Sequence, residues 1–181
     1  MSRIPLHTSA SVPEAALPYL RAVTHDLPAP LNFQAQMAHA PAVIASYAGI
    51  RRALTEHGTL DPKTRTAIML AASDALQATY PVAVNTRLAG LAGWTPEQIS
   101  ALRAGHSATD PALAALLTLV RQAAGNVGHV EDTAWAAAAG AGWSDGQVAE
   151  AFAYLGVTVY VAYFTHYTDT PLDVTYAPVG R

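Results

Sequence analysis

The segment LAGWTPEQISAL, residues 91–102, carries a complete local signal for the start of an α-helix. Thr95 can accept a hydrogen bond from the backbone N–H three residues on, and Gln98 can reach back to the Thr95 backbone, which together form a capping box. The segment GAGWSDGQVAEAF, residues 140–152, repeats the glycine, the tryptophan, the hydroxyl and the glutamine, and the two tryptophans lie 49 residues apart. We therefore expect two related helix-turn-helix units in which the tryptophans have a packing role.

Helical signals dominate the rest of the chain as well. Asp61 and Pro62 form a strong helix start, because aspartate is a good N-cap and proline suits the first helical position. The β-branched run at residues 157–161 lies inside a long helical pattern, so we interpret it as helix. The sequence therefore predicts an all-α helical bundle. Its expected helices cover residues 13–23, 33–39, 41–56, 63–76, 82–91, 111–124 and 145–165, with short ones after Thr95 and Asp132.

The composition limits the class of protein. The chain has 181 residues, of which 51% are hydrophobic and 13% are charged. This length suits one domain with a real core, and the charged fraction is low for a free monomer, so we expect a homo-oligomer. The expected organisation is an N-terminal extension with a short helix at residues 1–30, a helical domain at 31–175 and a tail at 176–181.

Charge and hydropathy argue against nucleic-acid and membrane partners. The net charge is −3 and no basic run exceeds Arg51-Arg52, so the electrostatic signature of nucleic-acid binding is missing. The most apolar long run, residues 148–164, contains Glu150 and is shorter than the roughly 20 apolar residues of a membrane span, so we expect a buried helix. Residues 1–14 have no apolar core of signal-peptide length, and we expect a cytoplasmic protein.

The absence of cysteine excludes several kinds of chemistry. Disulfides, thiolate catalysis and cysteine-bound metal all need that side chain. The seven histidines show no pair at the i, i+4 spacing of a zinc-binding helix, so no metal site is expected. There is no G-x-S-x-G or S-x-x-K motif and no glycine-rich phosphate loop after a strand, and no cofactor is expected.

The stretch QATYPVAVN, residues 77–85, holds one group of polar candidates around a proline. Tyr80 and Asn85 are the side chains in it that suit ligand binding. A purely structural interpretation is also open. Pro81 would then occupy the first turn of a helix capped by Thr79 or Tyr80, with Asn85 on the solvated face.

The last helix holds the second group of candidates. Tyr163, His166 and Tyr167 fall at i, i+3 and i+4, so they share one face of the helix. His166 could donate a proton near neutral pH. It could equally bind a carbonyl at the end of the helix, and the sequence leaves both roles open.

Three segments together resemble the carboxymuconolactone decarboxylase and alkylhydroperoxidase D-like superfamily. The run from NFQAQMAHAP to TAIMLAAS, residues 32–73, looks like the opening of that family, and AGWTPEQISAL, residues 92–102, looks like its next turn. YVAYFTHYTDTPLDV, residues 160–174, is similar to the tail of the peroxidase-related branch. The resemblance implies an alkylhydroperoxidase D-like helical fold.

The redox members of this superfamily carry a glutamate, then Cys-x-x-Cys, then a histidine, at offsets of 12, 15 and 19 residues from the glutamate. Carried over onto this chain, the glutamate position is Thr66, the two cysteine positions are Ala78 and Pro81, and the histidine position is Asn85. None of the four catalytic groups is present. Thiol peroxidase activity needs a thiolate nucleophile and a resolving thiol, so we do not expect it here.

The resemblance also implies a small pocket between helices and assembly into trimers or hexamers. We expect Thr66, Tyr80 and Asn85 to bind a small carbonyl or carboxylate compound, with Asn85 holding its oxygen. His166, Tyr163 and Asn85 are the candidate catalytic residues for a cysteine-independent decarboxylase-like or lyase-like reaction. The alternative is a non-catalytic binding or assembly protein of the same fold.

Overall fold

The structure, a computed structural model, describes residues 2–7, 11–105 and 110–174. All regular elements among these residues are helices, which confirms the all-α prediction. Contacts divide the chain into two compact units, Met1–Gly58 with Tyr163–Thr175, and Thr59–Ala162. The domain limits expected at residues 30 and 175 stay a prediction, and the expected tail at 176–181 lies outside the described residues.

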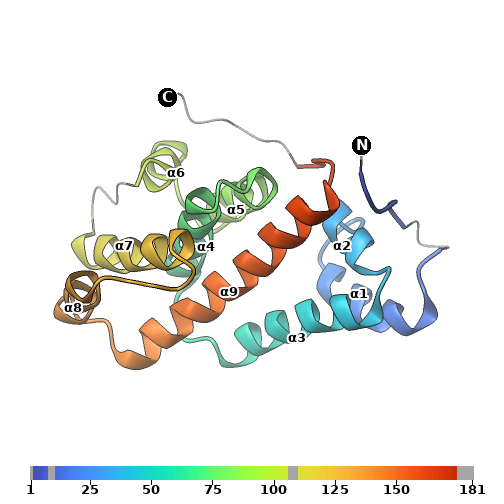
Figure 1. Cartoon of the computed structure of the whole chain (residues 1–181). Helices are drawn as coiled ribbons and strands as arrows, with labels where there is room; N and C mark the ends of the chain where they lie inside the picture. Colours follow the sequence, from blue (N-terminus) through green and yellow to red (C-terminus); the bar gives the residue numbers. More distant parts are fainter. Residues whose placement is uncertain (1, 8–10, 106–109, 175–181) are drawn as a thin grey trace. The chain divides into compact units, whose positions relative to one another are not determined.

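The second unit is built around one buried helix. Helix α4 (Pro62–Ala75) packs against α5 (Thr79–Leu91), α6 (Pro96–Arg103) and α7 (Pro111–Gly125), and α7 packs against α8 (Asp132–Gly140) (Figure 1). Every residue of α4 from position 66 to position 73 is buried. A helix that is apolar on all sides is stable only inside a core, so α4 is the structural centre of this unit.

Aspartate caps start both helical repeats of the second unit. The Oδ1 atom of Asp61 accepts from the N–H groups of residues 63 and 64, at 2.9 and 3.1 Å. The Oδ1 atom of Asp110 accepts in the same way from the residues two and three positions on, at 2.9 and 3.2 Å. The predicted start at Asp61 is therefore confirmed, and an equivalent cap lies 49 residues later.

The two tryptophans of the repeated segments have equivalent roles. Trp94 Nε1 donates to the Lys63 carbonyl at 3.1 Å, and Trp143 Nε1 donates to the Ala112 carbonyl at 2.7 Å. Each acceptor lies in the first turn of the helix that opens the repeat. Both predicted capping boxes are also formed. The internal repeat and the packing role of its tryptophans are thus confirmed.

Helix α5 begins earlier than predicted. It starts at Thr79, which makes Pro81 its third residue, and its N-cap is Ala78, which provides no side-chain hydrogen bond. The prediction that Thr79 or Tyr80 caps the helix is wrong. N–H groups in the first turn have no acceptor within the helix, so proline is tolerated there without having to open the helix.

The first unit contains η1 (Glu14–Ala16), α1 (Leu17–Thr24), α2 (Asn32–Met37), α3 (Pro41–His57) and the last turns of α9 (Asp145–Thr168). Helix α3 packs against α1 and α2. Gln36 on α2 is only 1% exposed and connects several segments of this unit. Its Oε1 accepts from the hydroxyls of Thr168 and Thr170, at 3.3 and 2.6 Å, and its Nε2 donates to the Ile4 carbonyl at 2.7 Å.

Helix α9 is long and apolar. By length and composition it could cross a membrane, with a mean hydropathy of 1.3 over its most apolar window, and 44% of that window is buried in the structure. A single helix of this kind is weak evidence for a membrane span, because core helices of soluble proteins share these properties. The helix is continuous through residues 157–161, which confirms that this β-branched run is not a strand.

Candidate functional site

A tight turn at the end of α4 positions the start of α5. Gln77 adopts a positive φ of 51°. The N–H of Ala78 donates to the Ser73 carbonyl at 3.0 Å, and the N–H of Gln77 donates to the Asp74 carbonyl at 2.9 Å, which is a Schellman-type helix ending. Glycine usually occupies such a position, and a side chain there costs about 1 kcal/mol. The chain reverses at this turn, so that α5 packs on α4.

The polar side chain buried between α4 and α5 is Asn85, which is 6% exposed. Its Nδ2 donates to Ser73 Oγ at 2.8 Å and to the Met69 carbonyl at 3.3 Å. Ser73 Oγ itself donates to the Met69 carbonyl at 2.7 Å. Asn85 stands where the redox members of the family carry a histidine, and here it joins a closed network of three groups.

This network determines which way the Asn85 amide faces. The Ser73 hydroxyl hydrogen is used on the Met69 carbonyl, so Ser73 Oγ and the carbonyl both act as acceptors toward Asn85. A flipped amide would place oxygen against oxygen at both contacts. Among the described residues, Oδ1 of Asn85 takes part in no hydrogen bond. The group left for a ligand is therefore an acceptor, and the expected donation to a ligand's oxygen is not available in this arrangement.

The other positions that correspond, by the resemblance, to the redox residues of the superfamily are buried and largely apolar. Ala78 is 0% exposed and Pro81 is also buried. Thr66 is buried, and its Oγ1 donates to the carbonyls of Pro62 and Lys63, both at 3.0 Å. Its hydroxyl hydrogen is thus used within its own helix. Tyr80, the third predicted binding residue, is 4% exposed in the same unit.

A charged cluster lies at the C-terminal end of α4. Of its members, only Asp74 lies close in sequence to the predicted stretch at residues 77–85. Arg103 Nε lies 3.9 Å from Asp74 Oδ1, and Arg121 donates to the carbonyls of Leu102 and Ala71. Burial lowers the pKa of Arg121 below its ordinary value, although the Asp74 carboxylate opposes this. The two arginines come from α6 and α7, so no local spacing could have indicated this cluster.

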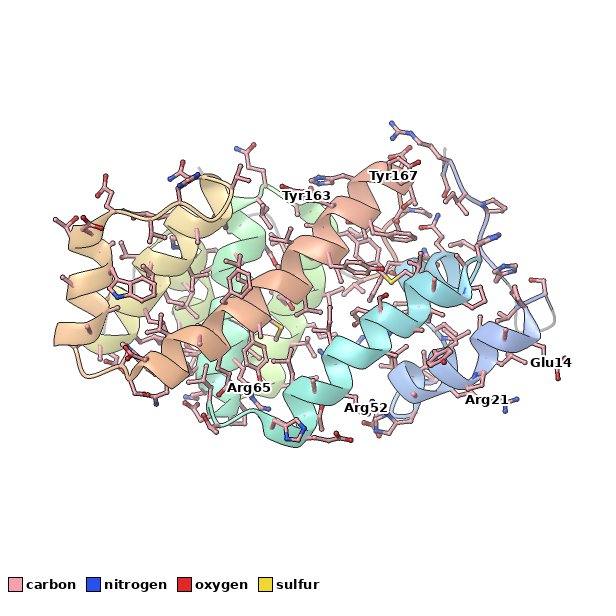
Figure 2. All side chains as sticks on the ribbon, turned by 60° about the horizontal axis from the view of Figure 1, so that its bottom comes forward. Glu14, Arg21, Arg52, Arg65, Tyr163 and Tyr167 are labelled. Atoms are coloured by element: carbon pink, nitrogen blue, oxygen red, sulfur yellow. The ribbon has the colours of Figure 1, made fainter. Side chains whose placement is uncertain are left out.

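The predicted residues of the last helix are exposed at its end. Tyr163 is 60% exposed and Tyr167 is 74% exposed (Figure 2), and His166 is exposed as well. The carbonyls at this helix end are bound by Arg3, whose Nη1 donates to Tyr167 O at 2.9 Å and to His166 O at 3.5 Å. Arg3 is thus the capping residue that the sequence patterns missed, and it lies more than 160 positions away.

The predicted site residues fall in different units. Thr66, Tyr80 and Asn85 belong to the second unit, whereas Tyr163 and His166 belong to the first. Their sharing of one site stays a prediction. In the part of the chain that the structure describes, no three His, Asp or Glu side chains are grouped in a way that could hold a metal ion.

The helix order and the cysteine-free turn after α4 define a class of protein, an alkylhydroperoxidase D-like all-α fold without a redox dithiol. Solved structures with this fold match the chain over almost its whole length. One is a Cys-to-Ala variant of the debrominase Bmp8 in complex with 2,3,4-tribromopyrrole, with 14% identity, a TM-score of 0.83, and coverage of 96% of this chain and 92% of that one.

Two further matches are uncharacterised peroxidase-related proteins. The protein from Ralstonia eutropha JMP134 has 18% identity and a TM-score of 0.82, covering 95% of this chain and 92% of that one. The protein from Silicibacter sp. TM1040 has 13% identity and a TM-score of 0.78, covering 97% and 93%. A comparison with curated proteins found no match.

Residues 41–124 match the model of the carboxymuconolactone decarboxylase family. This match covers just under half of the chain, and together with the fold it supports the resemblance to the carboxymuconolactone decarboxylase and alkylhydroperoxidase D-like superfamily that the sequence indicates. The chain itself has no cysteine.

Proposed function

We propose that the chain binds a small carbonyl compound with its own N–H or O–H donor, such as a lactam, an amide or a protonated carboxylic acid, beside Asn85, between α4 and α5. The single observation that carries this proposal is the Asn85 amide, held by Ser73 and Met69 with both N–H groups used and Oδ1 unbonded. Any turnover of the ligand would be a cysteine-independent, decarboxylase-like or lyase-like reaction. Thiol peroxidase chemistry has no nucleophile here.

The orientation of Asn85 narrows the class of ligand. An amide oxygen can only accept a hydrogen bond, so it favours a ligand with its own N–H or O–H donor and disfavours an ionised carboxylate. The apolar surroundings at Ala78 and Pro81 favour a small and mostly apolar body. Lactams, amides and protonated acids therefore fit better than esters or free carboxylates.

A structural neighbour supports this class. The debrominase variant with alanine in place of a cysteine was solved with 2,3,4-tribromopyrrole, a small ring that carries an N–H donor. The fold can thus hold a compound of this kind when a thiol is missing. Because the two sequences are only 14% identical, the neighbour supports the class of ligand, a small ring with an N–H donor, and does not identify the ligand of this chain.

The test compares two compounds of nearly the same shape, 2-pyrrolidone and γ-butyrolactone, by NMR titration of the 15N-labelled protein. The lactam has an N–H donor and the lactone has none. One hydrogen bond contributes roughly 1–1.5 kcal/mol, so the lactam should bind about tenfold more tightly. The largest shifts should fall on Asn85 and on the residues of the turn after α4.

Asn85→Leu should abolish the preference for the lactam, because it keeps the branched shape of the side chain and removes the acceptor. Asn126→Leu is the matched control, since Asn126 lies exposed at the end of α7 in the same unit. Equal affinity for the two compounds in the unmodified protein, or a preference that survives in Asn85→Leu, would refute the proposal.

Assembly is the second candidate function, and it rests on the exposed side of α9. Phe152 is 69% exposed, and Gly156 and Val159 follow one and two turns later, partly exposed on the same side. Small residues beside a large aromatic allow two helices to approach closely. We propose a cytoplasmic homo-oligomer, a trimer or hexamer, that uses this face.

Light scattering coupled to gel filtration tests the assembly. Phe152→Glu should lower the measured mass by breaking the contact between copies. The matched control is Ala137→Glu, an exposed alanine on α8 of the same unit. A monomeric unmodified protein, or an unchanged mass in Phe152→Glu, would contradict the proposed interface.

A further inference from the structure

The N-terminal segment Ser2–His7 is attached to the first unit by backbone contacts at several points. The N–H of Arg3 donates to the Thr168 carbonyl at the end of α9, at 2.8 Å. Gln36 Nε2 donates to the Ile4 carbonyl at 2.7 Å, and His39 Nε2 lies 2.8 Å from the Pro5 carbonyl. Figure 1 shows this segment running beside α2. It contains no helix or strand of its own, so these contacts hold it in place.

A pair of stacked histidine rings joins the segment to the turn between α2 and α3. The ring centroids of His7 and His39 are 3.7 Å apart, with an interplanar angle of 27°. Because the Pro5 carbonyl can only accept, Nε2 of His39 carries a hydrogen. Nδ1 of His7 lies 2.9 Å from Ser11 Oγ. Nε2 of His7 is buried and has no hydrogen-bond partner among the described residues.

Protonation of His7 conflicts with this arrangement. A charged imidazole carries N–H groups on both nitrogens, and the second one would be buried without an acceptor. Its charge would also lie directly against the His39 ring. Burial accordingly lowers the pKa of His7 below its ordinary value of 6.5, and the charge of His39 lowers it further.

We propose that His7 and His39 form an acid-sensitive clasp, which holds the segment Ser2–His7 against α2 and α9 at neutral pH and releases it when His7 is protonated. The folded state binds fewer protons at His7 than the unfolded state does, so the clasp becomes more stable as the pH rises. The clasp is fully closed above the ordinary histidine pKa of 6.5 and weakens as the pH falls toward the lowered pKa of His7. Release would free the end of α9 and the buried side chain of Gln36.

Among the described residues, no ion pair offsets the positive charge that His7 gains with a proton. Within the described residues, neither histidine of the clasp forms an ion pair with a carboxylate. Arg3 on the same segment is bonded to the carbonyls at the end of α9, and its positive charge also disfavours a second cation. The other acidic and basic side chains on α3, at the end of α9 and in the described segment after it are Asp173, which accepts from the Asn32 N–H, His166 and Asp169, and Arg51, Arg52, Glu56 and His57. The tyrosines of these elements, Tyr47, Tyr163 and Tyr167, carry no charge in this pH range.

Hydrogen exchange of the Arg3 amide, measured by NMR on the full chain, reports the clasp directly. Its protection factor should fall between about pH 7.5 and about pH 5.5, roughly tenfold for each unit by which the pKa of His7 lies below its ordinary value. His7→Phe keeps a stacked ring that takes up no proton, so its protection should change less than twofold over this range. His129→Phe, which replaces an exposed histidine of the second unit, should behave as the unmodified chain does.

The His7 Cε1 proton provides a second measurement that needs no substitution. A titration midpoint below 6.5, accompanied by loss of Arg3 protection over the same range, supports the clasp. A midpoint at or above 6.5, constant Arg3 protection, or an undiminished loss of protection in His7→Phe would overturn it.

Discussion

Glu150 offers the sharpest test of how the second unit is held together. Its carboxylate accepts from the Thr59 N–H at 2.8 Å, from the Thr59 hydroxyl at 2.6 Å and from the Leu60 N–H at 3.1 Å. These bonds tie the first turns of α9 to the segment just before α4. Two backbone donors and one hydroxyl therefore depend on one side chain, which comes from a distant part of the sequence.

The cost of losing this contact can be estimated from its bonds. A hydrogen bond to a charged group contributes about 1.5–3 kcal/mol, and a neutral one about 0.5–1.5 kcal/mol. Because the site is partly open to water, we take about 1 kcal/mol for each of the three bonds to the carboxylate and about half of that for each bond to a neutral amide. Glu150→Gln, which keeps an acceptor and loses the charge, should then cost about 1.5 kcal/mol. Glu150→Ala, which loses every bond, should cost about 3 kcal/mol.

The assay is urea unfolding followed by circular dichroism, together with thermal melting. For a chain of this size 1 kcal/mol shifts Tm by roughly 2–4 °C, so Glu150→Gln should lower Tm by roughly 3–6 °C. Glu56→Gln is the control, because the Glu56 side chain is 56% exposed and lies 3.9 Å from His57. The control should stay within about 0.5 kcal/mol of the unmodified protein.

The pH dependence gives an independent check. Burial raises the pKa of Glu150, but the bonds from Thr59 and Leu60 and the charge of Arg65 outweigh it and bring the pKa below its ordinary value of 4.5. The folded state thus favours the ionised form. The stabilisation is fully present above pH 4.5 and is lost as the pH falls through the lowered pKa.

The gap between the unmodified protein and Glu150→Gln should therefore narrow in acid. Stabilities within 0.3 kcal/mol of each other at neutral pH, which is about the additivity error, would refute this reasoning. So would a gap that persists below the pKa.

Three further substitutions test other features of the second unit. Val127 is 89% exposed and has a φ of 54°, a backbone conformation that is strained for a β-branched residue. Val127→Gly should therefore stabilise the protein by about 0.5–1 kcal/mol in urea unfolding, whereas Val127→Ala should not. A destabilised glycine variant would contradict this strain. Arg121→Met should destabilise by about 2–3 kcal/mol because it removes the guanidinium hydrogen bonds to the Leu102 and Ala71 carbonyls. A neutral result in the same assay would show that water replaces the guanidinium. Trp143→Phe should lower Tm more than Trp94→Phe, because the indole hydrogen bond of Trp143 is part-buried and shorter, at 2.7 Å against 3.1 Å. The reverse order would show that these two hydrogen bonds do not determine the difference in stability.

Local chemistry explains why much of the helical architecture could be predicted. Asp61-Pro62 and the capping boxes after the two tryptophans each act within about one turn, so their residues suffice to start a helix. The start of α5 was predicted less well, because a proline in the first turn does not distinguish the first helical position from the third.

The candidate site likewise combines features that can be predicted from the sequence with features that depend on the folded structure. The absence of a dithiol is a property of residue identity and can be read directly from the sequence, as can the all-α fold class. The amide orientation of Asn85 depends on a hydroxyl and a carbonyl that a neighbouring helix brings within reach, and only the tertiary structure decided it. The same holds for Arg3 at the end of α9 and for the His7–His39 stack, since each joins groups that meet only after the chain has folded.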